Sequence, residues 1–393
     1  MDDNLRSLRE RLRTFIDTEV IPAEPLFFEQ QEETGYWKTP VLDKLRESAK
    51  AQGLWALGHP AEIGGGGVSF MDFVYLNEVI GRSELGQFAV GSASMQDCHM
   101  LNLYGSAAQK ERWLYPMVRG EIFPSVGLTE PDAAGSDPTL MQSKAHFDGD
   151  EIVVDAHKWF TSGANNAAFT TVFAETDPDA ESRHRRFSAI IVPTDTPGYR
   201  VVRVVPTMGH VGGGHCEIRV EGARVPADNL LGTRGEGFVI AQRRLGPGRI
   251  FHCMRWLGQA QRAFDLMCAR ANVRYAHGSM LSEKGEIQRY VAESAAEIQG
   301  HRLMTLEAAR KLDAGDDARI EISLIKFHGA TMLHNVIDRA IQVHGAMGLT
   351  SDTPLDRMYR EARYGRIYDG PDEVHRMSVA RRLLRDPSLV PWA

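Results

Sequence analysis

The stretch GLTEPDAAGSD, residues 127–137, is the most informative part of this 393-residue chain. It has the pattern of a strand that ends in a polar turn. Small residues in such a turn let a planar ligand approach the backbone closely. Hydroxyl groups and free amides of the turn can hydrogen-bond the heteroatoms on the edge of that ligand. The alternative for the same residues is a plain β-turn with no ligand.

A second stretch, KWFTSGA, follows at residues 158–164. Alternate residues of a β-strand point to the same face of a sheet. The alternation predicts that Trp159 and Thr161 share a face, which would combine an aromatic wall with a hydroxyl group. A tryptophan on a strand is also typical of a sandwich core, so the core reading stays open for Trp159.

Two further stretches lie near the end of the chain, QVHGAMG at residues 342–348 and YDGPDEVHR at residues 368–376. In the first, the spacing of Gln342, Gly345 and Gly348 predicts a helical turn that ends in a glycine-rich segment. Such a segment can present a carbonyl or an amide to a phosphate or an adenine ring. The second places the carboxylate of Asp369 beside two residues, Gly370 and Pro371, that are typical of a turn.

The region between residues 123 and 232 predicts a β domain, because short β-rich runs alternate there with turn residues. The predicted strands cover residues 151–154, 169–174, 188–192, 199–205 and 216–220. No helical pattern separates them, which favours an antiparallel sandwich or barrel.

Helical spacing of apolar residues occupies both sides of this region. Before it, helices are predicted from residue 5 to 16 and over 41–51, 70–80 and 109–119; after it, over 238–272, 285–312 and 319–343. The motif Gly246-Pro247-Gly248 predicts an interruption or a kink in the first of the later helices. The glycines at 64–67 suggest a flexible loop that leads into the helix at 70; a phosphate-binding loop is the weaker alternative, since no Lys-Ser/Thr follows them.

The composition excludes several functional classes. With 45 basic and 52 acidic residues, the net charge of −7 argues against broad electrostatic binding to nucleic acid or to an anionic membrane. No run of 18 apolar residues exists, so no membrane-spanning helix is expected. The four cysteines have neither metal-clip nor disulfide-framework spacing, which favours a reducing, cytoplasmic location.

The four stretches, in this order and over essentially the whole chain, resemble the acyl-CoA dehydrogenase family. The resemblance implies an α+β multidomain fold: an N-terminal helical domain at 1–122, a central antiparallel β domain at 123–235 and a C-terminal four-helix bundle at 236–393. It implies FAD as cofactor and the α,β-dehydrogenation of an acyl-CoA thioester to a trans-2-enoyl-CoA, as in the β-oxidation of fatty acids. The combination of RLGPGRI at 244–250 with DGPDEVH at 369–375 resembles the branch fused in eukaryotes to an aminoglycoside-phosphotransferase-like kinase domain.

The resemblance also assigns roles to individual residues. It implies cofactor binding by Leu128, Thr129, Ser136, Trp159, Phe160, Thr161, Arg274, His277, Gln342, Gly345, Ala346, Pro371 and Glu373. It implies substrate binding by Ser136, Arg249 and Gly370. Two departures weaken single assignments: the turn before Ser136 is one residue longer than the common form, and His277 replaces the usual phenylalanine.

Asp369 occupies the position of the family's base, which removes the proton α to the thioester carbonyl. Most members have a glutamate there, and aspartate is one methylene shorter. Other members carry the base on the helix after the β domain, where this chain has Gly248. The alternative for Asp369 is a capping role at the helix that begins near Pro371.

The resemblance implies partners as well. Arg274 and Gln342 belong to segments that act from a neighbouring subunit in the family, so a homo-oligomer, dimer or tetramer, is expected. Electrons are expected to pass to an electron-transferring flavoprotein. A flavin oxidase or monooxygenase acting on a nitroalkane is the alternative function, because relatives of that kind use an aspartate base. His210 and His215 are interpreted as loop residues, and no metal is expected.

Overall fold

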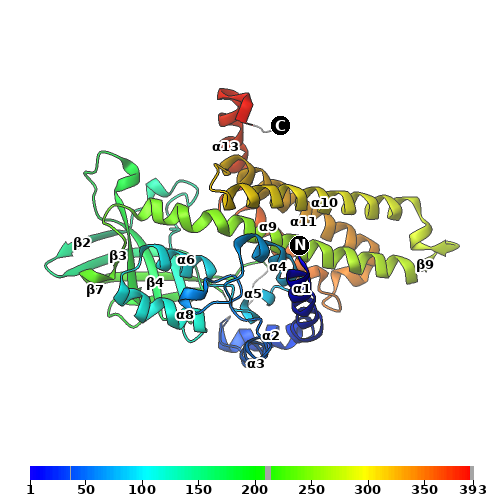
Figure 1. Cartoon of the computed structure of the whole chain (residues 1–393), viewed down its shortest axis with the longest axis horizontal. Coiled ribbons are helices and arrows are strands. Elements are labelled where there is room, and N and C mark those ends of the chain that lie inside the picture. The colour runs from blue at the N-terminus through cyan, green and yellow to red at the C-terminus, as the bar shows by residue number, and fades with distance from the viewer. Residues whose placement is uncertain (36, 209–213, 390–393) are drawn as a thin grey trace. The chain divides into compact units, whose positions relative to one another are not determined.

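The computed structural model describes residues 1–35, 37–208 and 214–389. The chain forms two compact units (Figure 1). Unit 1 comprises residues 1–18, 69–86 and those from 246 onward, and unit 2 comprises residues 19–68 and 87–245. The three-domain division at 122 and 235 follows the order of elements along the chain and stays a prediction.

Unit 2 contains an eight-stranded sheet with the strand order β6-β7-β3-β2-β4-β5-β8, in which β1 pairs with β4. The strands are β1 (Pro124–Gly127), β2 (Lys144–Asp148), β3 (Glu151–Ser162), β4 (Phe169–Glu175), β5 (Phe187–Pro193), β6 (Tyr199–Val204), β7 (His215–Pro226) and β8 (Leu230–Leu231). All five predicted strands are confirmed. The antiparallel prediction holds for most pairs, but β1 and β4 are parallel over four residue pairs.

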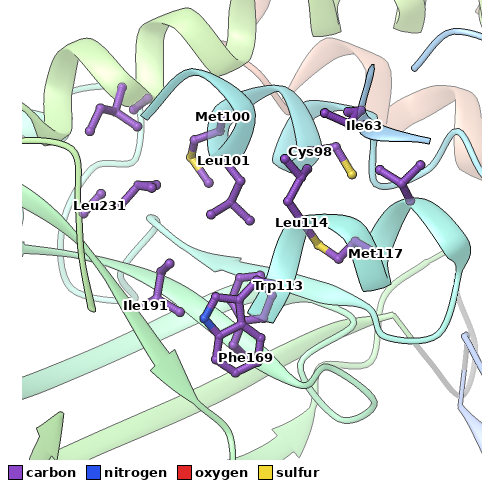
Figure 2. Close-up of a cluster of buried hydrophobic side chains, with 14 of the residues drawn as sticks. Ile63, Cys98, Met100, Leu101, Trp113, Leu114, Met117, Phe169, Ile191 and Leu231 are labelled. Atoms are coloured by element: carbon purple, nitrogen blue, oxygen red, sulfur yellow. The ribbon is translucent and has the colours of Figure 1, made fainter. Parts of the chain in front are cut away.

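The strands β4 and β5 are buried on both faces, which explains the apolar run of β5 at residues 189–192. Ala189 and Ile191 of β5 belong to one apolar cluster, and Ile190 and Val192 belong to the other. Figure 2 shows the first cluster, where the ring of Trp113 lies 4.8 Å from that of Phe169. A strand with both faces covered loses the apolar–polar alternation of a half-exposed strand.

Three helical segments of unit 2 pack on this first face of the sheet, namely α6 (Met95–Tyr104), η3 (Lys110–Leu114) and α8 (Tyr115–Arg119). The unit contains α2 (Ile21–Thr34), α3 (Pro40–Ala51), α5 (Gly86–Ala89), α6 (Met95–Tyr104), α7 (Ala107–Gln109), the π-helical turn η3 (Lys110–Leu114) and α8 (Tyr115–Arg119). The predicted helix at 41–51 is confirmed as α3, and that at 109–119 as the run from α7 to α8.

The glycine-rich loop at 64–67 is held by its own backbone. The amides of Gly65 and Gly67 donate to the carbonyl groups of Pro60 and His59, and the amide of Gly66 donates to that of Ala56, at 2.9–3.0 Å. These amides are therefore used inside the protein and are not directed at a phosphate group. A Cβ atom at Gly65 would lie 2.3 Å from the carbonyl oxygen of His59, so the close backbone approach requires glycine.

Unit 1 is helical. It contains α1 (Asp3–Phe15), α4 (Phe70–Ile80), α10 (Gly285–Asp313), α11 (Arg319–His344), α12 (Leu355–Ala362) and α13 (Asp372–Arg385), with most of α9 (Gly237–Val273) and the hairpin of β9 (Tyr275–Ala276) and β10 (Ser279–Met280). The predicted helices at 70–80, 238–272, 285–312 and 319–343 are confirmed. The predicted interruption at 246–248 is absent, because α9 runs through Pro247.

The helices α9 and α11 run in the same direction, since α10 reverses the chain between them. The sulfur of Cys253 on α9 lies 3.6 Å from the carbonyl oxygen of Ile325 on α11. A Cβ atom at Gly329 on α11 would lie 3.1 Å from the Trp256 ring. These contacts define a constant register between the two helices, and that register positions the residues of the candidate site below.

Two buried histidines make the stability of the fold sensitive to acid. Burial lowers the pKa of His59 in unit 2 to about 4, and burial with the charges of His328 and Arg302 lowers that of His301 in unit 1 to about 3. As the pH falls below about 6.5, the unfolded chain binds protons at both rings and the folded chain does not. The free energy of unfolding therefore decreases as the pH falls.

We expect each of these histidines to remove roughly 2 kcal/mol of stability between pH 6.5 and pH 5. Urea unfolding at pH 7, 6 and 5 measures the loss directly. Equal free energies of unfolding at pH 7 and pH 5 would contradict the expectation.

Within residues 1–35, 37–208 and 214–389, every helix is too short or too polar to traverse a lipid bilayer.

Candidate functional site

The backbone of Asp369 is fixed in an unusual conformation between η9 (Arg363–Arg366) and α13. Its φ is 54°, in the left-handed region, and that of Gly370 is 102°. The Nε of Arg249 donates to the carbonyl oxygen of Asp369 at 2.9 Å, and the Nε2 of His375 lies 3.1 Å from the same oxygen. Left-handed backbone at a residue other than glycine is often found at functional sites, where surrounding contacts hold it in place.

The carboxylate of Asp369 faces a histidine from α9. The Nε2 of His252 lies 3.2 Å from Oδ2 of Asp369. On the other side of the ring, Nη2 of Arg255 lies 2.8 Å from Nδ1 of His252. Burial, followed by the charge of Arg255, lowers the pKa of His252 to about 4, so this ring is neutral at pH 7.

A buried lysine closes the same cluster from α11. Lys326 is 0% exposed, and its Nζ donates to the carbonyl oxygen of Gly365 at 2.7 Å and to that of Gly370 at 3.4 Å. The ammonium also lies 5.3 Å from the ring centre of Trp256 and 5.0 Å from that of Tyr368. The ring N–H of Trp256 donates to the hydroxyl of Tyr368 at 2.9 Å.

Positive charge exceeds negative charge around this carboxylate. Burial lowers the pKa of Arg249, Arg255 and Lys326 below their usual values. The negative charge of Asp369 offsets part of this lowering in each case. Positive charges close to a carboxylate favour its ionised form. The arrangement is suited to proton removal at a carbon atom, with nearby cations that stabilise a developing negative charge.

In unit 2, a buried ion pair supports the turn that follows β1. The Nζ of Lys158 lies 2.7 Å from Oε1 of Glu130, and the two side chains are 0% and 5% exposed. Glu130 also accepts from the hydroxyl of Ser143 at 2.6 Å and from the amide of Gln142 at 2.6 Å. Burial opposes the ionised form, but the charge and hydrogen bond of Lys158 hold the pKa of Glu130 below its usual range.

Lys158 and its neighbour Trp159 fix the backbone at the start of the predicted ligand-binding turn. The Nζ of Lys158 donates to the carbonyl oxygen of Leu128 at 3.2 Å, and the amide of Trp159 donates to the carbonyl oxygen of Thr129 at 3.0 Å. Leu128, Thr129 and Gly135 line a small cavity at this turn. The two stretches at 127–137 and 158–164 therefore form one structural element, as expected of a shared ligand site.

The prediction that Trp159 and Thr161 share a face is wrong. Lys158 pairs with Ile218 and Thr161 pairs with Cys216, so two residues of β3 lie opposite one residue of β7. The extra residue forms a β-bulge at Phe160, where φ is 50°. The bulge returns Thr161 to the face of Lys158 and leaves Trp159 on the other.

Two polar groups of this strand are buried without a hydrogen-bond partner in the described part of the chain. They are the ring N–H of Trp159 and the hydroxyl of Thr161. Buried polar groups are nearly always satisfied in native proteins, so each exception calls for an explanation such as a bound ligand. Phe160 and Ser136, by contrast, are exposed.

The remaining predicted site residues of unit 1 lie at the opposite end of the helices from Asp369. Arg274 follows α9, and 25 residues of helix separate it from Arg249, about 37 Å at 1.5 Å per residue. The α9–α11 register places Arg274 level with the end of α11, where Gln342, Gly345 and Ala346 are exposed. His277 lies at the hairpin turn with φ 50° and is also exposed.

The structure therefore brings Arg249, Asp369 and Gly370 together, with Pro371 next in sequence. It separates them from the far-end set of Arg274, His277, Gln342, Gly345 and Ala346. Glu373 is exposed on the first turn of α13.

Sequence reasoning missed the residues that surround the carboxylate and the turn: His252, Arg255, Trp256, Lys326, Glu130 and Lys158. One signal was present for part of this set. Arg249, His252 and Trp256 have the spacing of one helix face, and Lys326 interrupts an otherwise apolar stripe.

Among the described residues, no group of three or more histidine, cysteine, aspartate or glutamate side chains is arranged to hold a metal ion. His210 lies outside the described residues.

Comparison with known protein families covers nearly the whole chain. The N-terminal, middle and C-terminal domains of the acyl-CoA dehydrogenase family match residues 2–121, 125–223 and 235–384. A probable acyl-CoA dehydrogenase of Mycobacterium tuberculosis, FadE2, is 41% identical, with 95% of this chain and 93% of the relative covered. Acyl-CoA dehydrogenase family member 11 of Rattus norvegicus is 40% identical over 96% of this chain, and the chain spans half of that relative's length.

Solved structures show the same fold. A putative acyl-CoA dehydrogenase from Mycobacterium abscessus superposes with a TM-score of 0.92 at 38% identity, covering 98% of this chain and 99% of that chain. A structure described as the electron transferring flavoprotein of Acidaminococcus fermentans superposes with a TM-score of 0.87 at 26% identity, with 98% and 99% covered.

Proposed function

The chain belongs to the acyl-CoA dehydrogenase family, and from this membership we propose that it oxidises an acyl-CoA thioester to the trans-2-enoyl-CoA with Asp369 as the base. The observation that carries the proposal is the carboxylate of Asp369 on a fixed backbone near three cations, the buried Lys326 and the half-buried Arg249 and Arg255.

Asp369 removes the proton from the α-carbon, and its carboxylate becomes a carboxylic acid. The electron pair left on the α-carbon forms the new bond to the β-carbon as the β-hydrogen leaves with its own pair. When bound, FAD supplies the two-electron acceptor for that hydride. Arg249 and Lys326 contribute positive charge near the carbon that is deprotonated, where negative charge accumulates on the way to the product.

The residues of unit 2 fit a flavin. The ring N–H of Trp159 is a buried polar group that a heteroatom-rich ring system can satisfy. The hydroxyl of Thr161 lies on the opposite face of the strand, so its part in cofactor binding rests on the family resemblance alone. The Lys158–Glu130 pair holds Leu128 and Thr129 in place beside a small cavity. In this proposal Leu128, Thr129 and Trp159 would hold the isoalloxazine, and Phe160 and Thr161 belong to the same cofactor-binding stretch. Ser136 would serve the flavin phosphate or the thioester end of the substrate.

In this proposal the far-end set contributes to the cofactor site of a second copy of the chain. The set comprises Arg274, His277, Gln342, Gly345 and Ala346. Its distance of about 37 Å from Arg249 along α9 supports action across a subunit boundary. Arginine suits a diphosphate because its fork-shaped donors bind two oxygens at once. A homodimer is then the minimal active form and a tetramer a pair of such dimers; an active monomer in gel filtration contradicts this assignment.

The electron acceptor in this proposal is an electron-transferring flavoprotein. Support comes from the acyl-CoA dehydrogenase family, to which the chain belongs. A role in fatty acid β-oxidation and a cytoplasmic location stay predictions of the sequence.

An anaerobic titration of the FAD-loaded protein with acyl-CoAs of increasing chain length tests the proposed function. We expect at least one of them to bleach the flavin absorbance stoichiometrically. No bleaching by any acyl-CoA, in protein that retains FAD, contradicts the proposal. Bleaching by a nitroalkane together with rapid reoxidation in air would establish the oxidase alternative, with which an aspartate base is compatible.

A further inference from the structure

We infer that His252, oriented by Arg255, is a positioning residue that orients the Asp369 carboxylate for removal of the α-proton. This inference rests on the proposed function, because it assigns the residue that prepares the base for its reaction. The three side chains form a chain of contacts from Arg255 through the imidazole to the carboxylate, with separations of 2.8 Å and 3.2 Å.

The contact with Arg255 determines the tautomer of His252. An arginine side chain has donors and no acceptor, so its contact with Nδ1 requires a lone pair on that nitrogen. The proton of the neutral ring must then be on Nε2, the nitrogen that faces Asp369. His252 therefore directs its N–H at Oδ2 across a 3.2 Å separation that falls short of an aligned hydrogen bond, and its lowered pKa agrees with a ring that stays neutral.

The contact from His252 acts on the carboxylate of Asp369, whereas the other contacts act on the backbone. Arg249 and His375 hold the carbonyl oxygen of Asp369, and Lys326 contacts that of Gly370, so the backbone is fixed from three sides. None of these contacts sets the torsion of the carboxylate itself. The 3.2 Å contact from His252 is within hydrogen-bond reach of Oδ2, and catalytic hydrogen bonds often shorten and align when substrate binds.

The groups around His252 and Asp369 influence how easily Asp369 is protonated. The ionisable groups acting on His252 are Arg255 on its own helix, Lys326 on α11 and Asp369 itself. The Tyr368 ring packs against the imidazole at 4.8 Å between ring centres. A hydrogen bond to an ionised carboxylate favours the ionised form. Removal of the donor should therefore make Asp369 easier to protonate.

The test compares His252→Phe, His252→Gln and Arg255→Leu by anaerobic rapid mixing with the acyl-CoA that bleaches the wild-type flavin. We expect His252→Phe to slow flavin reduction roughly 10- to 100-fold with little change in acyl-CoA affinity, as for other residues that orient a catalytic group. The acid limb of the pH profile should move to higher pH in this variant. His252→Gln, which keeps an N–H donor, should recover most of the rate, and Arg255→Leu should lie between the two.

A wild-type rate and an unshifted acid limb in His252→Phe would overturn the inference. So would equal losses in the phenylalanine and glutamine variants, because a purely structural role gives no rescue by a donor. FAD content and the urea midpoint report folding in each variant. The wild-type titration comes first: no reduction by any acyl-CoA refutes the proposed function itself, whereas a wild-type rate in His252→Phe refutes only the positioning role.

Discussion

Replacement of Asp369 by asparagine is expected to leave FAD bound and to slow flavin reduction by acyl-CoA about a thousandfold, within the ~10²–10⁴ range of a lost general base. An amide cannot accept the α-proton, and Asp369 is the carboxylate that faces His252 in the described part of the chain. Anaerobic rapid mixing, with flavin absorbance as the signal, measures the rate.

Asparagine is the cleanest substitution at this position. The contacts from Arg249 and His375 go to the backbone carbonyl of Asp369, so they survive the exchange. Asparagine also tolerates the left-handed backbone at φ 54° as readily as aspartate does. The matched control is Asp352→Asn at an exposed loop position, which should reduce at the wild-type rate. Fast reduction in Asp369→Asn would remove the base assignment.

Replacement of Lys158 by methionine is expected to destabilise the protein by about 3–5 kcal/mol, the usual cost of breaking a buried ion pair. The exchange keeps the length of the side chain but leaves the carboxylate of Glu130 buried without its charged partner. It also removes the bond from Nζ to the carbonyl oxygen of Leu128, so FAD content should fall with stability. Urea unfolding of the purified variant gives the free energy, and absorbance at the flavin band gives the cofactor content.

The double variant Lys158→Met with Glu130→Gln is the control for this prediction. With both charges removed, no uncompensated charge remains buried, and part of the lost free energy should return. Two outcomes would show that the pair does not support the turn. One is a single variant as stable as the wild type, and the other is a double variant that loses more free energy of unfolding than the two single variants together.

The helices of this chain were accessible from the sequence because their signal is local. Apolar residues three and four apart identify α10 and α11 to within a residue or two, whatever the rest of the chain does. The interruption predicted at Pro247 is absent, because in this case the local signal does not decide the structure. A proline costs one hydrogen bond in a helix, and the remaining bonds and the packing of α9 outweigh that loss.

The face of Thr161 could not be predicted, because a β-bulge has no dependable sequence signal. Bulges of this kind often place glycine in the left-handed position, and this one places Phe160 there. One inserted residue reverses every later side chain of a strand. Strand alternation was therefore correct before Lys158 and wrong after it.

The base itself was found through a motif, but its surroundings were not. His252 and Asp369 are 117 positions apart, and only the packing of α9 against the segment before α13 brings them together. Lys326 likewise depends on carbonyl groups of Gly365 and Gly370, about 40 positions later in the chain. Residues that act on a functional group from a distant part of the chain carry no spacing pattern that a single sequence reveals.

The most direct test of the base assignment is hydrogen exchange at the α-carbon, independent of flavin reduction. An acyl-CoA with no hydrogen on its β-carbon cannot be oxidised, but a base in the site still removes and returns its α-proton. In D₂O, followed by mass spectrometry, we predict that the wild-type protein incorporates deuterium at the α-carbon and that Asp369→Asn does not. Deuterium incorporation at the same rate in both proteins would contradict the account.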